Sequence, residues 1–143
     1  MNTNLRQHLP TVLALAAALS APVLAATGIA EAPAPQVYNN IKVVSGGVSL
    51  DEADAVKRLA PDYRLRVILS GRGGEYQVAH SLAVVKQGQV IARIPDAGPY
   101  VLMDLPAGHY TLEGEFAGLS MSRDVDVTWA GTTLNWVLPS SVN

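Results

Sequence analysis

The spacing of apolar side chains along the chain changes at Tyr63. Beyond that residue they recur at every second position in short segments, each bounded by Gly or Pro. The segments cover about 63–70, 78–84, 90–94, 101–105, 110–116, 121–129 and 134–138. A period of two predicts strands with one buried and one solvated face. Seven such strands at this spacing are typical of an antiparallel sandwich or a small barrel.

Ahead of these segments the sequence carries one helix signal. Ser49 and Glu52 have the Ser-x-x-Glu spacing of a capping box, and Pro61 ends the pattern. A helix over 50–60 is therefore predicted, with a short strand over 38–44 before it. A helix of this length is not stable alone in water, so we expect it to pack against a sheet.

These patterns predict an all-β fold, an antiparallel seven-stranded Ig-like β-sandwich with one short N-terminal helix, over residues 38–143. The preceding segment 26–37, "ATGIAEAPAPQV", has small side chains and two prolines. Such a composition cannot bury a face, so this segment is expected to be a flexible, extended tether.

Residues 1–25 have the pattern of a secretory signal peptide. The apolar run 11–25 is Ala-rich and shorter than the roughly 20 residues of a spanning helix. Val23 and Ala25 stand at the −3 and −1 positions of a cleavage site. The sequence thus predicts a periplasmic protein without a membrane span after cleavage; an uncleaved N-terminal anchor is the alternative. Because no Cys follows the run, a lipoprotein anchor is excluded.

Charge and cysteine content narrow the function classes. The chain has 12 acidic and 10 basic residues, interspersed, for a formal net charge of −2. This balance argues against nucleic acid or an anionic membrane as the partner. The chain has no cysteine, which excludes disulfides, thiol catalysis and thiolate metal sites.

One stretch resembles a known family. "LPAGHYTLEGEFAG", residues 105–118, is similar to the Leu-Pro-x-Gly-x-Tyr-Thr-Leu signature of carboxypeptidase regulatory-like domains, which are prealbumin-like (transthyretin-like) β-sandwiches. Pro106 and a left-handed Gly108 are expected to make a tight turn, after which Tyr110 enters the core with its hydroxyl near a loop. The segments "SGGVSLDEADAV" and "GRGGEY" are similar to small exported proteobacterial proteins that carry this domain.

The resemblance covers 63–139 and implies a fold more than an activity. In zinc carboxypeptidases the domain is an appendage without the metal, and this sequence contains no His-Glu-x-x-His or His-x-x-Glu pair. Transthyretin-like hydroxyisourate hydrolases share the fold, but they depend on an Arg/His set and a Tyr-Arg-Gly-Ser-type C-terminus. This chain ends "PSSVN".

The strongest candidate binding site in the sequence is the Gly-rich loop 71–76. Its glycines allow close approach to the backbone, and Arg72 beside Glu75 could bind a small anion or a sugar. It is not a phosphate loop, because a strand follows where a helix would be needed. Tyr76 and His80 complete the predicted ligand-binding set. A flexible or bulged turn is the alternative interpretation.

His80 is expected on the buried face with Val78 and Leu82, unless a bulge interrupts the strand. It could serve as a ligand-binding imidazole, or it could be satisfied by a backbone carbonyl at the sheet margin. A lone His lacks the second group that acid–base catalysis needs.

The remaining candidates favour structural roles. His109 is expected to be exposed in a turn, and two histidines beyond the signal peptide are too few for zinc. Asp124 and Asp126 are expected on a solvated face rather than in a calcium site. Both Trp129 and Trp136 follow the buried alternation, so both are predicted to lie in the core. No metal and no cofactor are predicted.

The sequence therefore favours a non-catalytic exported module that acts through an unknown protein partner, a second copy of itself, or a weakly bound small ligand. One alternative is a carbohydrate- or small-ligand-binding domain that uses the loop with Tyr76 or Tyr100. Another is a small transthyretin-like hydrolase that uses Arg72, His80 and His109.

Overall fold

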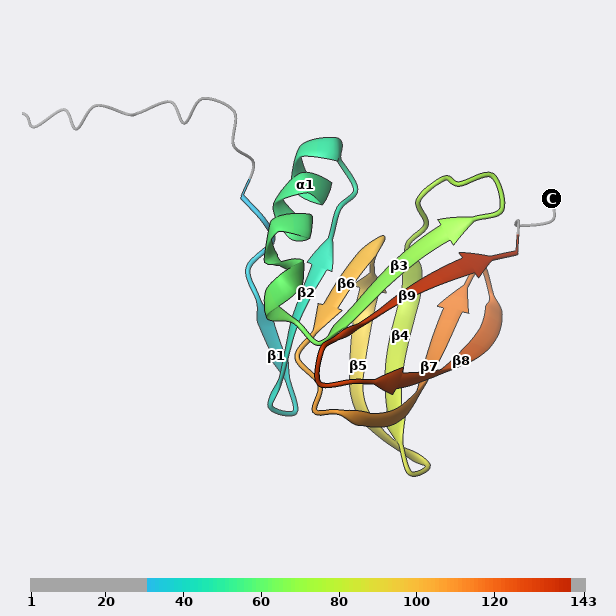
Figure 1. Cartoon of the computed structure of the whole chain (residues 1–143). Helices are drawn as coiled ribbons and strands as arrows, with labels where there is room; N and C mark the ends of the chain where they lie inside the picture. The colour runs from blue at the N-terminus through green and yellow to red at the C-terminus, as the bar shows by residue number, and fades with distance from the viewer. Residues whose placement is uncertain (1–30, 140–143) are drawn as a thin grey trace, which may run out of the picture.

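Two β-sheets make up most of residues 31–139, the part of the chain that the computed structural model describes (Figure 1). The predicted signal peptide and residues 26–30 of the tether lie outside this range. The elements are β1 (Gln36–Tyr38), β2 (Ile41–Gly46), α1 (Leu50–Leu59), the 3-10 turn η1 (Ala60–Asp62), β3 (Leu65–Gly71), β4 (Ala79–Lys86), β5 (Gln89–Ala97), β6 (Tyr100–Met103), β7 (Gly108–Phe116), β8 (Leu119–Val127) and β9 (Thr132–Leu138). No helix within residues 31–139 is long and apolar enough to cross a membrane.

The strand order is β1-β2-β6-β3-β9 in one sheet and β5-β4-β7-β8 in the other. Neighbouring strands are antiparallel, as predicted, with one exception. β9 lies parallel to β3, with Leu65 opposite Thr132 and Gly71 opposite Leu138. This pair forms because the chain leaves β8 in the second sheet and crosses to the edge of the first (Figure 1).

All seven alternating segments beyond Tyr63 form strands, β3 to β9. The count of seven strands is nevertheless wrong for the domain, because residues 36–46 add a hairpin where one short strand and the end of a tether were expected. Its turn residues Asn39 and Asn40 have φ of 49° and 65°. Asn tolerates this left-handed backbone, which two-residue hairpin turns require.

The two sheets pack face to face on a shared core. It includes Leu65, Val67 and Leu69 of β3, Leu82 and Val84 of β4, Ile94 of β5, Met103 of β6, Leu112 of β7 and Trp136 of β9. The Trp136 ring meets Phe116 edge-on, with centroids 5.9 Å apart. Gly114 leaves room for this contact, since a Cβ there would lie 2.5 Å from Phe116 Cε2. The expected burial of Trp136 is confirmed, at 1% exposure.

Helix α1 covers the outer face of the first sheet. Ala53 and Val56 of the helix pack with Val44, Tyr100 and Leu102 of the strands beneath. The predicted cap is confirmed, because the Glu52 amide donates to Ser49 Oγ at 3.2 Å. The Glu52 carboxylate accepts from the Gly47 amide at 2.7 Å instead of reaching back to Ser49. This hydrogen bond connects the first turn of α1 to the residue that follows β2.

The turn between β6 and β7 is fastened by Tyr110. Its ring is buried and its hydroxyl donates to the Pro106 carbonyl at 2.7 Å, which agrees with the expected core position near a loop. Gly108 has a positive φ of 159°, a backbone conformation that residues with a side chain rarely adopt, so the expected need for glycine at this turn is confirmed. A Cβ there would also lie 3.0 Å from Lys86 Nζ.

Replacing Tyr110 by Phe removes this bond and leaves the Pro106 carbonyl without its partner. We expect a loss of about 1 kcal/mol in unfolding free energy, which corresponds to a fall of roughly 4–8 °C in Tm for a domain near this size. Thermal unfolding followed by circular dichroism measures it. Tyr38→Phe is the matched control, because Tyr38 donates only to the exposed Gln36 side chain. Equal Tm values for the two variants would contradict this role of Tyr110.

Candidate functional site

The Gly-rich loop 71–76 folds into an ordered turn between β3 and β4. The Gly71 amide donates to the Glu75 carbonyl at 2.7 Å, and the Gly74 amide donates to the Gly71 carbonyl at 3.0 Å. The Glu75 carboxylate folds back over Gly71 and Gly73, where a Cβ would collide with it. The glycines therefore make room for Glu75, and within residues 31–139 Arg72 and Glu75 form no ion pair.

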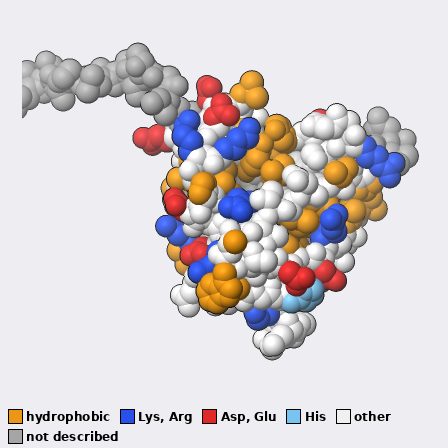
Figure 2. All heavy atoms as spheres, viewed as in Figure 1, with side chains coloured by type: hydrophobic (Ala, Val, Ile, Leu, Met, Phe, Trp, Pro, Cys, Tyr) orange, Lys and Arg blue, Asp and Glu red, His pale blue; other side chains and the backbone are white. Residues whose placement is uncertain are grey.

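Tyr76 fastens this loop to the sheet. The Tyr100 hydroxyl donates to the Tyr76 hydroxyl at 2.8 Å, and the ring centroids are 5.4 Å apart. Burial, together with this hydrogen bond, raises the pKa of Tyr100 to about 12. Tyr100 is buried, so its expected role as an exposed aromatic is wrong, whereas Tyr76 stays 46% exposed. Figure 2 shows hydrophobic side chains on this face, between α1 and β3.

His80 is exposed, so its predicted burial is wrong, as is that of Val78. The alternation changes phase at the start of β4, because Ala79 and Leu82 both point into the core with two residues between them. On the partner strand β5, Asp96 opposite this point has a left-handed φ of 48°. A local irregularity of this kind moves a side chain to the other face of the sheet.

The three residues of the hydrolase hypothesis, Arg72, His80 and His109, do not lie close together. His109 is the second residue of β7, which is antiparallel to β4 with Val85 opposite Thr111. The position opposite His109 is about seven residues along the chain from His80. At ~3.3 Å per residue this is a separation of roughly 23 Å. Arg72 lies in the loop near the His80 end of β4. The hypothesis of one site built from Arg72, His80 and His109 is not supported.

His109 pairs instead with Asp126 on the neighbouring strand β8. Its Nδ1 donates to Asp126 Oδ1 at 2.6 Å, and both side chains are exposed, as expected. That hydrogen bond raises the pKa of His109 above its usual 6.5, and the charges of Asp126 and Asp124 add to the effect. Asp124 accepts from Thr111 Oγ1 at 2.7 Å. Both carboxylates therefore serve cross-strand pairs on a solvated face.

Replacing Asp126 by Asn should lower the pKa of His109 toward 6.5, which an NMR titration of the imidazole measures. Since the folded pKa is raised, the pair stabilises the fold fully below the unfolded pKa and loses this effect as pH rises through the folded pKa. Wild type and variant should thus differ most in Tm near about pH 5 and least near about pH 9. Asp124→Asn is the control with the smaller expected shift. An unchanged His109 titration in the Asp126 variant would contradict the pairing.

Trp129 is 80% exposed, so its predicted burial is wrong. β8 ends at Val127, and the chain then turns through 128–131, where the alternation of a strand no longer applies. The turn is ordered: the Gly131 amide donates to the Thr128 carbonyl at 3.1 Å, and Thr132 Oγ1 donates to the Asp126 carbonyl at 2.8 Å. The adjacent Ala130-Gly131 was the signal in the sequence that the strand had already ended.

The indole of Trp129 is held by Arg64 and borders an open cavity. The guanidinium carbon of Arg64 lies 5.1 Å from the ring centroid, within the range of a cation–π contact. Arg64 Nη1 is 3.9 Å from Asp104 Oδ1. The cavity has a volume of about 240 Å³, and Asp62 and Tyr63 also line it. An aromatic plane, a guanidinium and two carboxylates therefore meet at one end of the molecule.

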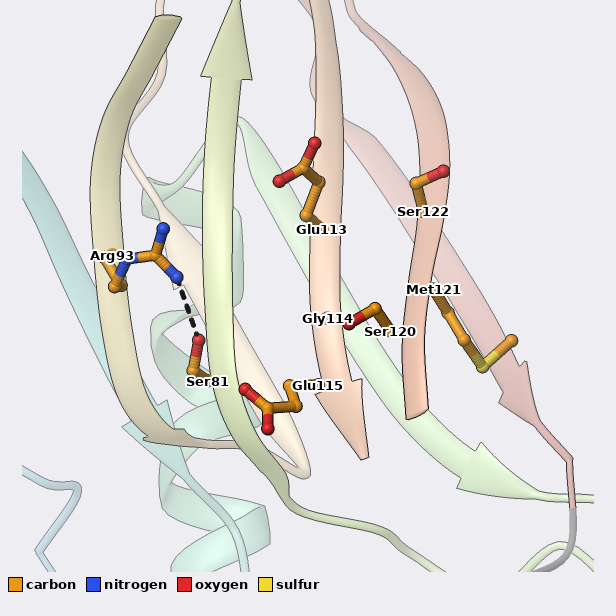
Figure 3. A pocket seen from close by; sticks show the side chains of 8 residues that line it. All are labelled: Ser81, Arg93, Glu113, Gly114, Glu115, Ser120, Met121 and Ser122. Carbon is orange, nitrogen blue, oxygen red and sulfur yellow. Dashed lines mark hydrogen bonds between the residues drawn. The ribbon is translucent and has the colours of Figure 1, made fainter. Parts of the chain in front are cut away.

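The outer face of the second sheet offers a different hollow (Figure 3). Its volume is about 350 Å³, and Ser81, Ser120 and Ser122 lie among its lining residues. Arg93 donates to Ser81 Oγ at 3.4 Å, while Glu113 and Glu115 project from β7. This is an open, polar sheet face. Among the residues that the structure describes, no group of three or more His, Cys, Asp or Glu is placed to hold a metal ion.

No protein-family model matches this chain, and no curated protein matches it.

Proposed function

We propose that the protein is a non-catalytic exported module of the carboxypeptidase regulatory-like, prealbumin-type β-sandwich class, and that it binds carbohydrate through Trp129. The observation that carries the proposal is the indole of Trp129, which is 80% exposed yet held by an ordered turn and by Arg64. The class rests on the signal-peptide pattern and on the Leu-Pro-x-Gly-x-Tyr stretch, whose Tyr110 bonds to Pro106.

A rigid, solvated indole suits a flat ligand. Trp loses little conformational entropy on binding, because only two side-chain torsions have to be fixed. Burial of its surface contributes roughly 25 cal/mol per Å² of apolar area. Arg64 already restrains the ring, so part of that ordering is complete before any ligand arrives.

The neighbours of Trp129 favour a sugar. A pyranose ring has an apolar C–H face that stacks on an indole, and a rim of hydroxyls that need donors and acceptors. Arg64 can donate, and the carboxylates of Asp62 and Asp104 can accept. A protein partner would need a wider surface, about 800 Å² on each side. The other exposed large hydrophobic residues within residues 31–139 are Val37, Val48, Leu50, Tyr76, Val78, Val90, Leu119 and Val137, and none of them lines this cavity.

Affinity electrophoresis in gels that contain soluble polysaccharides tests the proposal. We expect retardation by at least one polysaccharide, and a loss of affinity of at least about tenfold in Trp129→Ala, since a buried Trp anchor contributes ~2 kcal/mol or more. The free energy of unfolding should change by less than about 0.5 kcal/mol, because the side chain lies at the surface.

Leu50→Ala is the matched control. Leu50 is also 80% exposed, but it lies at the start of α1. This variant should bind as the wild type does. Equal binding by Trp129→Ala and wild type, or no retardation of the wild type by any polysaccharide, would refute carbohydrate binding through Trp129.

A further inference from the structure

A second cavity is lined by residues of the β1–β2 turn, the β6–β7 turn and the end of β4. Its floor is made by Ile41, Leu105 and Tyr110, and its walls include Lys86, Ile91 and Pro106. Its volume is about 400 Å³, within the range of roughly 300–1,000 Å³ that is usual for small-molecule pockets. Trp129 and Arg64 do not line it, and Asp104 is the one residue that it shares with the Trp129 cavity.

Hydrogen bonds fix the rim of this cavity. Asn39 Nδ2 donates to the Ile91 carbonyl at 3.1 Å, which ties the β1–β2 turn to β5. Tyr110 Oη donates to the Pro106 carbonyl, which holds the β6–β7 turn. Because both rims are tied to the sheets, the pocket exists before a ligand binds.

Lys86 supplies a positive charge above the apolar floor. Its Nζ lies 4.5 Å from the centroid of the Tyr110 ring and close to the space beside Gly108. Within the described part of the chain, Lys86 forms no ion pair. The other charged lining residue, Asp104, faces Arg64 at 3.9 Å. The positive end of the pocket is therefore at Lys86.

We propose that this pocket binds a small amphipathic carboxylate, with the anionic head on Lys86 and the apolar body over Ile41, Ile91 and Leu105. The charge on Lys86 selects the head group, because burying an anion without a partner is costly. The apolar floor selects a hydrocarbon body over a purely polar acid. The concave shape and small volume favour a small molecule over a protein segment.

Isothermal titration calorimetry with octanoate tests the proposal on the folded chain, with 1-octanol and octyltrimethylammonium as probes that share the tail and differ in the head. Octanoate should bind more tightly than either. Lys86→Met keeps the apolar stem and removes the charge, so octanoate should bind at least about tenfold more weakly, as expected for the loss of a charged hydrogen bond.

Lys57→Met is the matched control. Lys57 also lies over a tyrosine ring, that of Tyr100 at 5.6 Å, but it belongs to α1 and does not line the pocket. This variant should bind octanoate as the wild type does.

If Lys86→Met does not fold, an NMR titration of the wild-type chain with octanoate tests the location of the site instead. The amide signals of Ile91 and Leu105 should shift when octanoate is added. They should keep their positions when octanol is added at the same concentration. Absence of octanoate binding, equal affinity for octanol, equal affinity in the Lys86 variant, or shifts confined to other residues would each overturn the proposal.

Discussion

The structure depends on the contact between the inner faces of its two sheets. Alternate side chains of both sheets meet in one apolar core, where the rings of Trp136 and Phe116 pack edge to face. Among the described residues, the buried set contains no charged side chain, and no buried side-chain polar atom lacks a hydrogen bond. Such a core stabilises the fold and leaves recognition to the faces and ends of the sheets.

The end formed by the β6–β7 and β8–β9 turns carries both candidate ligand sites. Asp104 borders the Trp129 cavity and also the Lys86 pocket, and Tyr110 fixes the turn between them through Pro106. The stretch that resembles a family signature lines the Lys86 pocket through Leu105, Pro106 and Tyr110. The Gly-rich loop at the other end of β4 is held by Tyr76 and by the folded Glu75 side chain, which explains its glycines by local packing.

Much of the fold could be predicted because the controlling interactions are local. Leu65, Val67 and Leu69 alternate along a regular strand and are buried, and Ser49 caps a helix whose ends match the sequence signals. The parallel position of β9 could not be predicted, because it depends on a crossover between sheets rather than on any local pattern. The β1–β2 hairpin was missed because its first strand is only 3 residues long.

The candidate site was harder to predict, because it lies where regular alternation stops. His80 follows a change of phase at the start of β4, and Trp129 lies beyond the end of β8. The rule that every second strand residue is buried therefore predicted burial for both, and both are exposed. Arg64 and Asp104 reach Trp129 only through the folded arrangement of three distant segments. A Trp immediately before an Ala-Gly turn was the one signal in the sequence that pointed to an exposed aromatic.

Iodide quenching of tryptophan fluorescence tests the packing of the two sheets directly, because the chain has two tryptophans with opposite environments, Trp136 at 1% exposure and Trp129 at 80%. We expect the wild-type emission to contain a readily quenched component and a protected one. The quenched component should disappear in Trp129→Phe while the protected one remains. If the emission of that variant were still readily quenched, Trp136 would not lie between the sheets, and the shared core on which the fold depends would be contradicted.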